Sequence, residues 1–303
     1  MPTPRQPLPP GLAAAGFTTA AAYESDVSRR RLRHPSLASP FVGGRVAGTG
    51  PALSDTVGRA RALAPLLDER HTFGRLTALR LRGVDLPPRF RRHSELQLVV
   101  TDPGARVRRR GVSCRLVPHY GTFGILGGLQ VASGTTTFLH LAKELTMEEL
   151  VMVGDALTRR VNPLATVSEL EAHIAGAPTT AGVARAREAL LHIVAGTDSV
   201  PETILRRILE SHGFARPEVN LRAYYQGSYL GRPDLSYPDL KISIEYLGDV
   251  HRTDPRTWRI DVERDQCFRD AGWTVLEATA HNLRHPESLL HRLAEAGAPR
   301  NAH

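Results

Sequence analysis

Two short runs of alternating polar and apolar residues, placed on either side of a turn sequence, constrain this chain more than any other feature. The first run covers residues 231–237 and the second covers residues 241–246, with Pro238-Asp239 between them. Such alternation is typical of β-strands, and Pro-Asp is typical of a turn. We therefore predict an antiparallel hairpin centred between Asp239 and Leu240, which places Asp234 opposite Glu245.

This predicted opposition makes Asp234 and Glu245 candidate metal ligands. Directly opposed residues of an antiparallel pair have Cβ atoms about 4.5–5.5 Å apart. Two carboxylates at that separation repel each other unless a cation or a proton lies between them. A divalent metal site is one interpretation. The alternative is that both acids are solvated residues on the wet face of an antiparallel sheet.

The basic residues are concentrated in the N-terminal two thirds of the chain. Residues 1–199 contain 25 Lys+Arg against 16 Asp+Glu, whereas residues 200–303 contain 14 against 15. Arginine-rich runs of this kind suit phosphate backbones, so we expect DNA as a partner. The alternative is a general preference for arginine, because only two of the 39 basic residues are lysines.

Residues 1–50 are predicted to form a winged-helix-like DNA-binding segment. Helix formers span 17–23, and Ser25 or Asp26 is the expected cap of a second helix that continues to residue 33. A Gly-rich turn within residues 41–46 suits a β-wing. This arrangement would place four basic side chains against DNA. They are Arg29, Arg30, Arg31 and Arg33.

The remaining residues are predicted to form two further domains of an α+β protein. Residues 51–196 combine strands at 96–101, 112–117 and 129–132 with helices that follow them. Residues 199–303 have the order α-β-β-β-α-β-α: a helix after Ser199, a strand at 218–223, the hairpin, a helix at 255–270, a strand at 273–276 and a helix at 286–294. This order predicts a small mixed sheet with helices packed against it.

Composition predicts a cytoplasmic protein without a membrane span. No run of 18 apolar residues occurs, and the first twenty residues lack an apolar signal core. The two cysteines, Cys114 and Cys267, have no CxxC or histidine-rich neighbours, so we expect them to be reduced rather than paired or bound to zinc.

The C-terminal hundred residues resemble the PD-(D/E)xK nuclease superfamily, and more narrowly its Vsr-like, restriction-endonuclease-like domains. The resemblance covers about residues 199–295 and depends on four motifs in order. They are Arg232-Pro233-Asp234-Leu235, Ile244-Glu245-Tyr246-Leu247-Gly248-Asp249-Val250-His251, Asp261-Val262-Glu263-Arg264 and Gly272-Trp273-Thr274-Val275. The N-terminal part is similar to AbiEi-type antitoxins. Residues 29–33, 41–46 and 136–142 carry that likeness.

The nuclease resemblance implies a Mg²⁺-dependent endonuclease acting on DNA. Asp234 and Glu245 would bind the metal, with Glu202, at the position of the family's helical acid, as a direct or water-mediated ligand. His251 would act as a general base or contact the scissile phosphate; its alternative role is an exposed loop histidine. Glu202 has an equally plain structural role, because acids in a first helical turn stabilise the helix.

Leu247 departs from the family pattern, which has a further carboxylate or lysine at this position. Asp249 would take that role if the strand bulged at Gly248. Otherwise the site has decayed, and the chain is an antitoxin-like transcriptional regulator with a toxin or other protein partner and an inactive nuclease-like domain. An enzyme acting on RNA is a third hypothesis.

Overall fold

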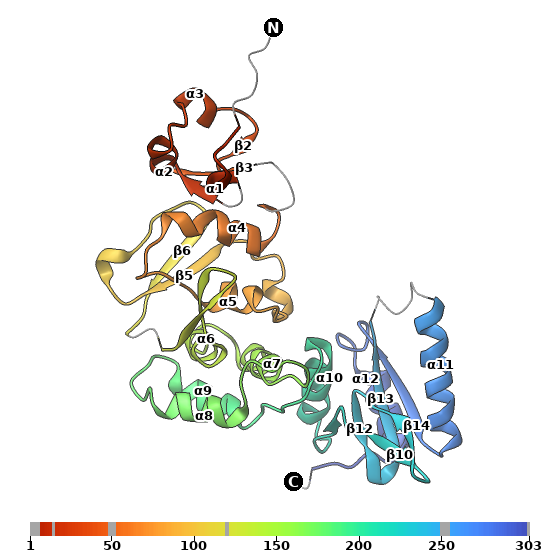
Figure 1. Cartoon of the computed structure of the whole chain (residues 1–303). Helices are drawn as coiled ribbons and strands as arrows, with labels where there is room; N and C mark the ends of the chain where they lie inside the picture. The colour runs from red at the N-terminus through yellow and green to blue at the C-terminus, as the bar shows by residue number, and fades with distance from the viewer. Residues whose placement is uncertain (1–6, 14–15, 48–52, 119–120, 249–254, 302–303) are drawn as a thin grey trace. The chain divides into compact units, whose positions relative to one another are not determined.

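The computed structural model describes residues 7–13, 16–47, 53–118, 121–248 and 255–301, with the side chains of residues 255–262 left aside. The chain divides into two compact units (Figure 1). The first contains residues 1–143 and 175–183, and the second contains residues 144–174 and 184–303. Both units contain helices and mixed β-sheets, so the predicted α+β class is confirmed.

The first unit begins with a small segment of helices and strands. Its elements are α1 (Pro10–Ala13), β1 (Gly16–Thr18), α2 (Thr19–Glu24), α3 (Arg29–Leu32), β2 (Leu37–Ala38) and β3 (Gly44–Ala47). The strands form one antiparallel sheet in the order β1-β3-β2. The predicted cap of the second helix is wrong: Ser28 caps α3, whereas Ser25 ends α2 and Asp26 has a left-handed backbone (φ 58°) that an N-cap does not adopt.

The rest of the first unit is a five-stranded sheet covered by helices. Its elements are α4 (Thr56–Leu63), β4 (Thr72–Phe73), α5 (Arg75–Leu81), β5 (Leu96–Val100), β6 (Val112–Leu116), β7 (Phe123–Leu126), β8 (Leu129–Ala132) and α6 (Gly134–Leu141), with 3₁₀ turns η2 (Ala64–Leu66), η3 (Pro88–Phe90) and η4 (Pro103–Ala105). The strand order is β6-β5-β4-β8-β7. All three predicted strands of this region are confirmed, and Asp55 caps α4.

The second unit contains helices followed by a four-stranded sheet. Its elements are α7 (Met147–Leu157), α8 (Val167–Ala175), α9 (Val183–Leu190), α10 (Val200–Ser211), β9 (Glu218–Val219), β10 (Ala223–Tyr225), β11 (Ser228–Gly231), β12 (Leu235–Tyr237), η5 (Pro238–Leu240), β13 (Ile242–Leu247), α11 (Pro255–Asp270), β14 (Thr274–Thr279) and α12 (Glu287–Glu295). The sheet order is β14-β13-β12-β9, with β13 and β14 parallel and the other pairs antiparallel.

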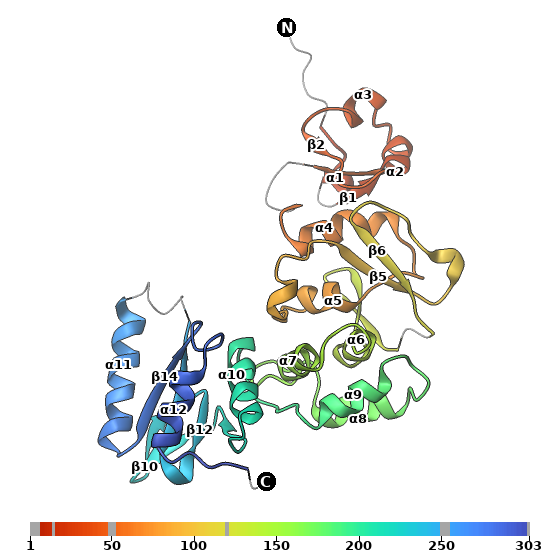
Figure 2. The ribbon, with the colours of Figure 1, turned by 180° about the vertical axis from the view of Figure 1, so that it is seen from behind.

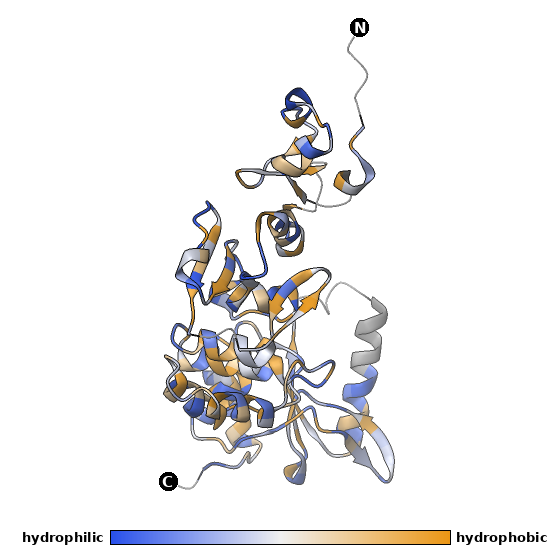
Figure 3. Ribbon diagram, turned by 60° about the vertical axis from the view of Figure 1, so that its left-hand side comes forward, coloured by the Kyte–Doolittle hydropathy of each residue, from blue (hydrophilic) through white to orange (hydrophobic). Residues whose placement is uncertain are grey.

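Helices cover both faces of this sheet. Helices α10 and α12 lie on one face and α11 lies on the other (Figures 1 and 2). Leu205, Leu209, Leu289 and Leu293 from α10 and α12 form a buried core with the apolar side of β12 and β13. The helices carry both hydrophilic and hydrophobic residues (Figure 3), as expected of amphipathic helices that cover a sheet.

The predicted strand at 218–223 is wrong in its extent, because the chain turns at Asn220. Asn220 has a left-handed backbone (φ 49°) and follows the end of β9. Residues 223–231 then form a separate hairpin, β10–β11, that the sequence pattern did not indicate. The run from 231 to 237 is likewise divided, since Gly231 ends β11, Pro233 cannot donate a ladder hydrogen bond, and β12 starts at Leu235.

Candidate active site

The register of the β12–β13 hairpin agrees with the prediction. Leu235 lies opposite Ile244, and Ser236 lies opposite Ser243. The turn between the strands is the 3₁₀ helix η5, followed by Lys241 in the left-handed region (φ 51°). One further step of this register places Asp234, the residue before β12, opposite Glu245.

Asp234 and Glu245 belong to the face of the sheet that α11 covers. Leu235 and Ile244 point into the core formed with α10 and α12, so the alternate positions face the other way. Two of these alternate residues, Ser236 and Ser243, are almost completely buried. Glu245 is also buried, with 6% of its surface exposed. The interpretation of these acids as freely solvated strand residues is therefore wrong for Glu245.

Both carboxylates have polar partners across the strands or from α11, and for Glu245 these include the backbone of Asp234. Asp234 Oδ2 accepts a hydrogen bond of 2.7 Å from the backbone amide of Tyr246. Glu245 Oε2 lies 3.3 Å from a guanidinium nitrogen of Arg264 on α11. Arg264 belongs to one of the four motifs of the nuclease resemblance, and the structure gives it Glu245 as a partner.

The pKa values of both acids are raised in the folded protein. Burial raises the pKa of Glu245, and the charge of Asp234 raises it further, while Arg264 opposes both effects. Burial also raises the pKa of Asp234, against the hydrogen bond from Tyr246 and the charge of Arg264. The two acids thus form an electrostatically frustrated pair, which a proton or a cation would relieve.

Glu202 lies close enough to Asp234 for their charges to interact, and it has structural contacts of its own. It is the third residue of α10, which Ser199 caps. Its carboxylate accepts hydrogen bonds from the Asp198 amide (2.9 Å), the Ser199 hydroxyl (2.8 Å) and the Asn220 side chain (2.8 Å). Burial, and then the charge of Asp234, raise its pKa to about 7. The charge of Asp234 therefore acts on Glu202, but both carboxylate oxygens of Glu202 already accept hydrogen bonds from other residues.

The rest of the predicted catalytic set is not assembled by the described residues. Leu247 continues β13 opposite Thr279 without a bulge, and its side chain is 38% exposed. His251 and Asp249 lie outside the described residues. Within the part of the chain that is described, no group of three or more His, Cys, Asp or Glu side chains is arranged to hold a metal ion.

The predicted DNA-binding arginines lie in the first unit, on and just after α3. Arg29, Arg30 and Arg33 are exposed, and we call these three the α3 arginines. Arg31 is half-buried and donates a hydrogen bond of 3.0 Å to the Ser36 hydroxyl. The β2–β3 hairpin exposes Val42 at its turn, as a wing would. However, α3 has only four residues and is about 6 Å long.

Sequence reasoning missed a buried ion pair that joins α10 to α7. Asp155 and Arg206 are both fully buried, and their side chains lie 2.8 Å apart. Asp155 also accepts hydrogen bonds from Thr203 and from the Val194 amide. This contact explains why the predicted joint at residues 196–199 falls inside the second unit. The sequence does not indicate that Arg206 is buried, because a charged residue in an amphipathic helix is expected on the solvent face.

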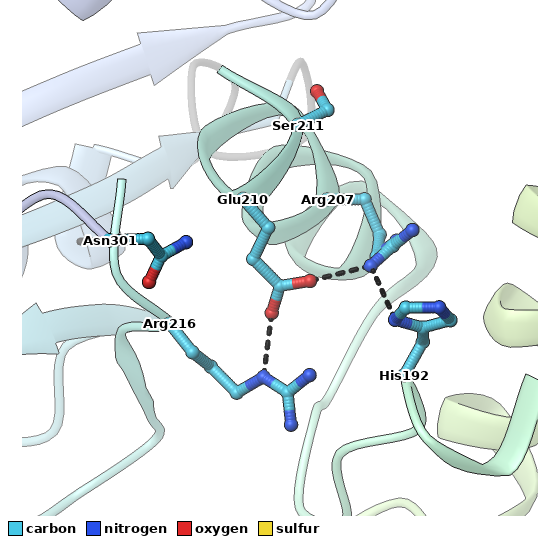
Figure 4. Close-up of a pocket in the computed structure, with 6 residues that line it drawn as sticks. All are labelled: His192, Arg207, Glu210, Ser211, Arg216 and Asn301. Carbon is cyan, nitrogen blue, oxygen red and sulfur yellow. Dashed lines mark hydrogen bonds and ion pairs between the residues drawn. The ribbon is translucent and has the colours of Figure 1, made fainter. Parts of the chain in front are cut away.

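A cavity of about 540 Å³ lies beside this network, at the end of α10 (Figure 4). Its charged residues already neutralise one another: Glu210 contacts Arg207 at 2.6 Å and Arg216 at 2.8 Å. Burial opposes ionisation of Glu210, but the surrounding arginines outweigh it and keep its pKa below the usual value. Paired charges of this kind indicate a structural network, so the acid pair is the stronger candidate site.

Comparison with known proteins gives relatives but no assigned activity. No family model matches the chain, and no solved structure matches it. Proteins from two strains of Mycobacterium tuberculosis, CDC 1551 / Oshkosh and H37Rv, are each 25% identical over 244 residues. The match covers 79% of this chain and 86% of each relative, and both relatives are named as uncharacterized proteins. Among the described residues, no helix is long and apolar enough to cross a membrane.

Proposed function

We propose that the second unit contains a restriction-endonuclease-like domain that hydrolyses phosphodiester bonds in DNA with the help of Mg²⁺. The observation that carries this proposal is the opposition of Asp234 and Glu245, two acids whose pKa values are both raised by burial. Keeping two like charges together in a buried place costs stability, and a bound cation would reverse that cost.

The donor set fits a hard, oxygen-loving cation. Mg²⁺ is commonly bound through one or two carboxylates and keeps several of its waters. Ser243 Oγ and Arg264 Nε are buried on the same face of the sheet, and neither has a hydrogen-bond partner among the described residues. Unpaired buried polar atoms are costly, and hydrating water of a cation would give them partners. When bound, Mg²⁺ supplies charge neutralisation and a more acidic water.

The roles of individual residues follow from their surroundings. Asp234 and Glu245 would hold the cation. The oxygens of Glu202 accept hydrogen bonds at the start of α10, so Glu202 would not be a direct ligand. It would orient Asn220 and interact with Asp234 through its charge. Arg264 would oppose the rise in the pKa of Glu245 that burial causes, and its guanidinium could contact a phosphate.

A second candidate function is a DNA-binding regulator of the AbiEi antitoxin type, with a nuclease-like domain that no longer cuts. Three observations favour it: Leu247 stands where a further acid is expected, Arg264 already neutralises Glu245, and the α3 arginines are exposed beside a wing-like hairpin. In that case the acid pair is a remnant, and protein partners such as a toxin would be sought in place of a metal.

Metal-linked stability and DNA cleavage, measured on the same variants, separate the two functions. We expect wild-type protein to cut plasmid DNA with Mg²⁺ or Mn²⁺ and to gain thermal stability from either ion. Asp234→Asn and Glu245→Gln should lose both properties. Asp239→Asn, which alters an exposed acid in the turn of the same hairpin, should keep both. If wild-type protein neither cuts nor responds to the metals, the nuclease proposal fails and the regulator remains.

A further inference from the structure

The β10–β11 hairpin presents tyrosine rings to solvent. Tyr224 and Tyr229 lie opposite each other on the two strands, with exposed fractions of 53% and 57%. Their ring centroids are 5.7 Å apart in an edge-to-face arrangement. Tyr225 is 39% exposed on the first strand. Large aromatic side chains gathered on an exposed surface commonly mark a binding site.

The hairpin is held in place by residues other than these tyrosines. Gln226 and Gly227 both have positive φ (49° and 82°), which suits the two-residue turn that joins tightly twisted strands. Ala223 and Leu230 pack against a small core that includes Phe268 and Trp273. The fold of the hairpin therefore does not require the rings of Tyr224 and Tyr229, and their exposure needs another explanation.

The surroundings of the rings are basic. No acidic residue occurs between positions 219 and 233, whereas Arg222 and Arg232 flank the hairpin. Lys241 has its Nζ 5.5 Å from the centroid of the Tyr225 ring, which follows Tyr224 in the strand and faces the other side of the hairpin. This local excess of positive charge stands out because residues 200–303 contain 14 Lys+Arg and 15 Asp+Glu. Exposed aromatic rings among basic side chains are the combination that binds single-stranded nucleic acid, through base stacking and phosphate contacts.

The side chain of Arg264 contacts both the end of the hairpin and the acid pair. Gly231, at the end of β11, lies so close to α11 that a Cβ atom there would be 3.1 Å from Arg264 Cδ and 2.9 Å from Phe268 Cε2. Arg264 reaches Glu245 from the same helix. A nucleic-acid strand bound to the hairpin would therefore lie against α11, the helix whose Arg264 contacts Glu245.

We propose that the β10–β11 hairpin is a stacking platform for single-stranded nucleic acid, on which Tyr224 and Tyr229 contact bases while Arg222 and Arg232 contact phosphates. This inference rests on the proposed function for its class of ligand, and it adds the prediction that the strand bound near the acid pair is unpaired. Binding through stacking requires no metal, so it is tested separately from cleavage.

The test is fluorescence anisotropy of labelled oligo-dT and oligo-U, with a duplex of equal length as comparison, in buffer containing EDTA. We expect the double variant Tyr224→Ala/Tyr229→Ala to bind the single strands at least about tenfold more weakly, and the duplex with little change. Tyr224→Phe/Tyr229→Phe keeps the rings and should bind within about twofold of wild type. Leu240→Ala, at an exposed apolar residue of the adjoining turn η5, should have no effect.

Three outcomes would overturn the inference. They are unchanged single-strand binding by the alanine variant, a loss in the phenylalanine variant as large as in the alanine variant, and no single-strand binding by wild-type protein. Sedimentation of the same variants covers a further outcome: a change of oligomeric state on removing the rings would show that the surface contacts a second copy of the chain. Single-strand binding that persists without any cutting would support the platform while removing the nuclease proposal.

Discussion

Replacing Glu202 with glutamine should make the second unit more stable at neutral and alkaline pH. Glu202 is 5% exposed, and burial together with the charge of Asp234 raises its pKa from 4.5 to about 7. Glutamine has the same shape. Its carbonyl oxygen can accept from the Asp198 amide and from Asn220, and its amide can donate to the Ser199 hydroxyl, so the three contacts of the carboxylate have replacements.

The direction of the effect follows from proton linkage. Between pH 4.5 and about 7 the folded protein holds a proton on Glu202 that the unfolded chain has already released. The free energy of unfolding therefore falls as pH rises through this window, and the cost of the buried charge is complete above it. Because the pKa rises from 4.5 to about 7, at about 1.36 kcal/mol for each tenfold change in proton affinity, the effect has an upper bound of roughly 3 kcal/mol.

Urea unfolding followed by tryptophan fluorescence measures this effect in the right part of the chain. Both tryptophans, Trp258 and Trp273, belong to the second unit. At pH 8 we expect Glu202→Gln to exceed wild type by up to about 3 kcal/mol, and at pH 4.5 we expect little difference. Glu287→Gln, at an exposed acid in the first turn of α12, is the matched control and should show no such gain.

The reasoning would be refuted by a Glu202→Gln protein whose stability follows the same pH curve as wild type. It would also be refuted by a variant that is less stable than wild type at pH 8, because the hydrogen bonds of the ionised carboxylate would then outweigh its burial. The assignment of the raised pKa to Glu202 is supported if the unfolding free energy of Glu202→Gln changes less with pH than that of wild type. Its slope against urea concentration should be unchanged, since that slope reports the surface exposed on unfolding.

Two further predictions concern charges elsewhere in the protein. Asp155→Asn should destabilise the second unit by about 1.5–3 kcal/mol in the same urea assay, because the fully buried Arg206 loses one of its two counter-charges and keeps only Glu210. Arg160→Met, which breaks the exposed pair with Asp198, should cost at most about 1 kcal/mol, and equal losses would contradict the distinction. If the first unit binds DNA, replacing the α3 arginines with alanine should lower the slope of log affinity against log salt by up to about 0.9 for each phosphate that these side chains neutralise; an unchanged slope would exclude them from the interface.

Much of the second unit's sheet could be predicted from sequence because its signals are local. Alternation with a period of two, interrupted by Pro238-Asp239, specifies a hairpin and its register, since a slip of one residue would move every side chain to the opposite face. The start of α10 is similarly local, because Ser199 and Glu202 lie within one helical turn. These short-range patterns were enough to place Asp234 opposite Glu245.

Other features escaped prediction because competing local signals were ambiguous. The run from 218 to 237 contains enough strand formers for longer strands, and only the left-handed backbone at Asn220 and the close packing of Gly231 on α11 divide it into β9, a separate hairpin and β12. The same ambiguity made the predicted cap of α3 wrong: it is Ser28 rather than Ser25 or Asp26, because a short polar residue suits either a cap or a left-handed turn.

By itself, the sequence determined the α+β class, most of the elements and the register that opposes two acids. Only the tertiary structure decided which polar groups meet: Arg264 pairs with Glu245, Arg206 pairs with Asp155, and Glu202 accepts a hydrogen bond from Asn220. The first two pairs join residues about 20 and 50 positions apart, and no periodicity marks them. Their attraction depends on burial, which lowers the dielectric around a charge, and burial is a property of the packed elements together.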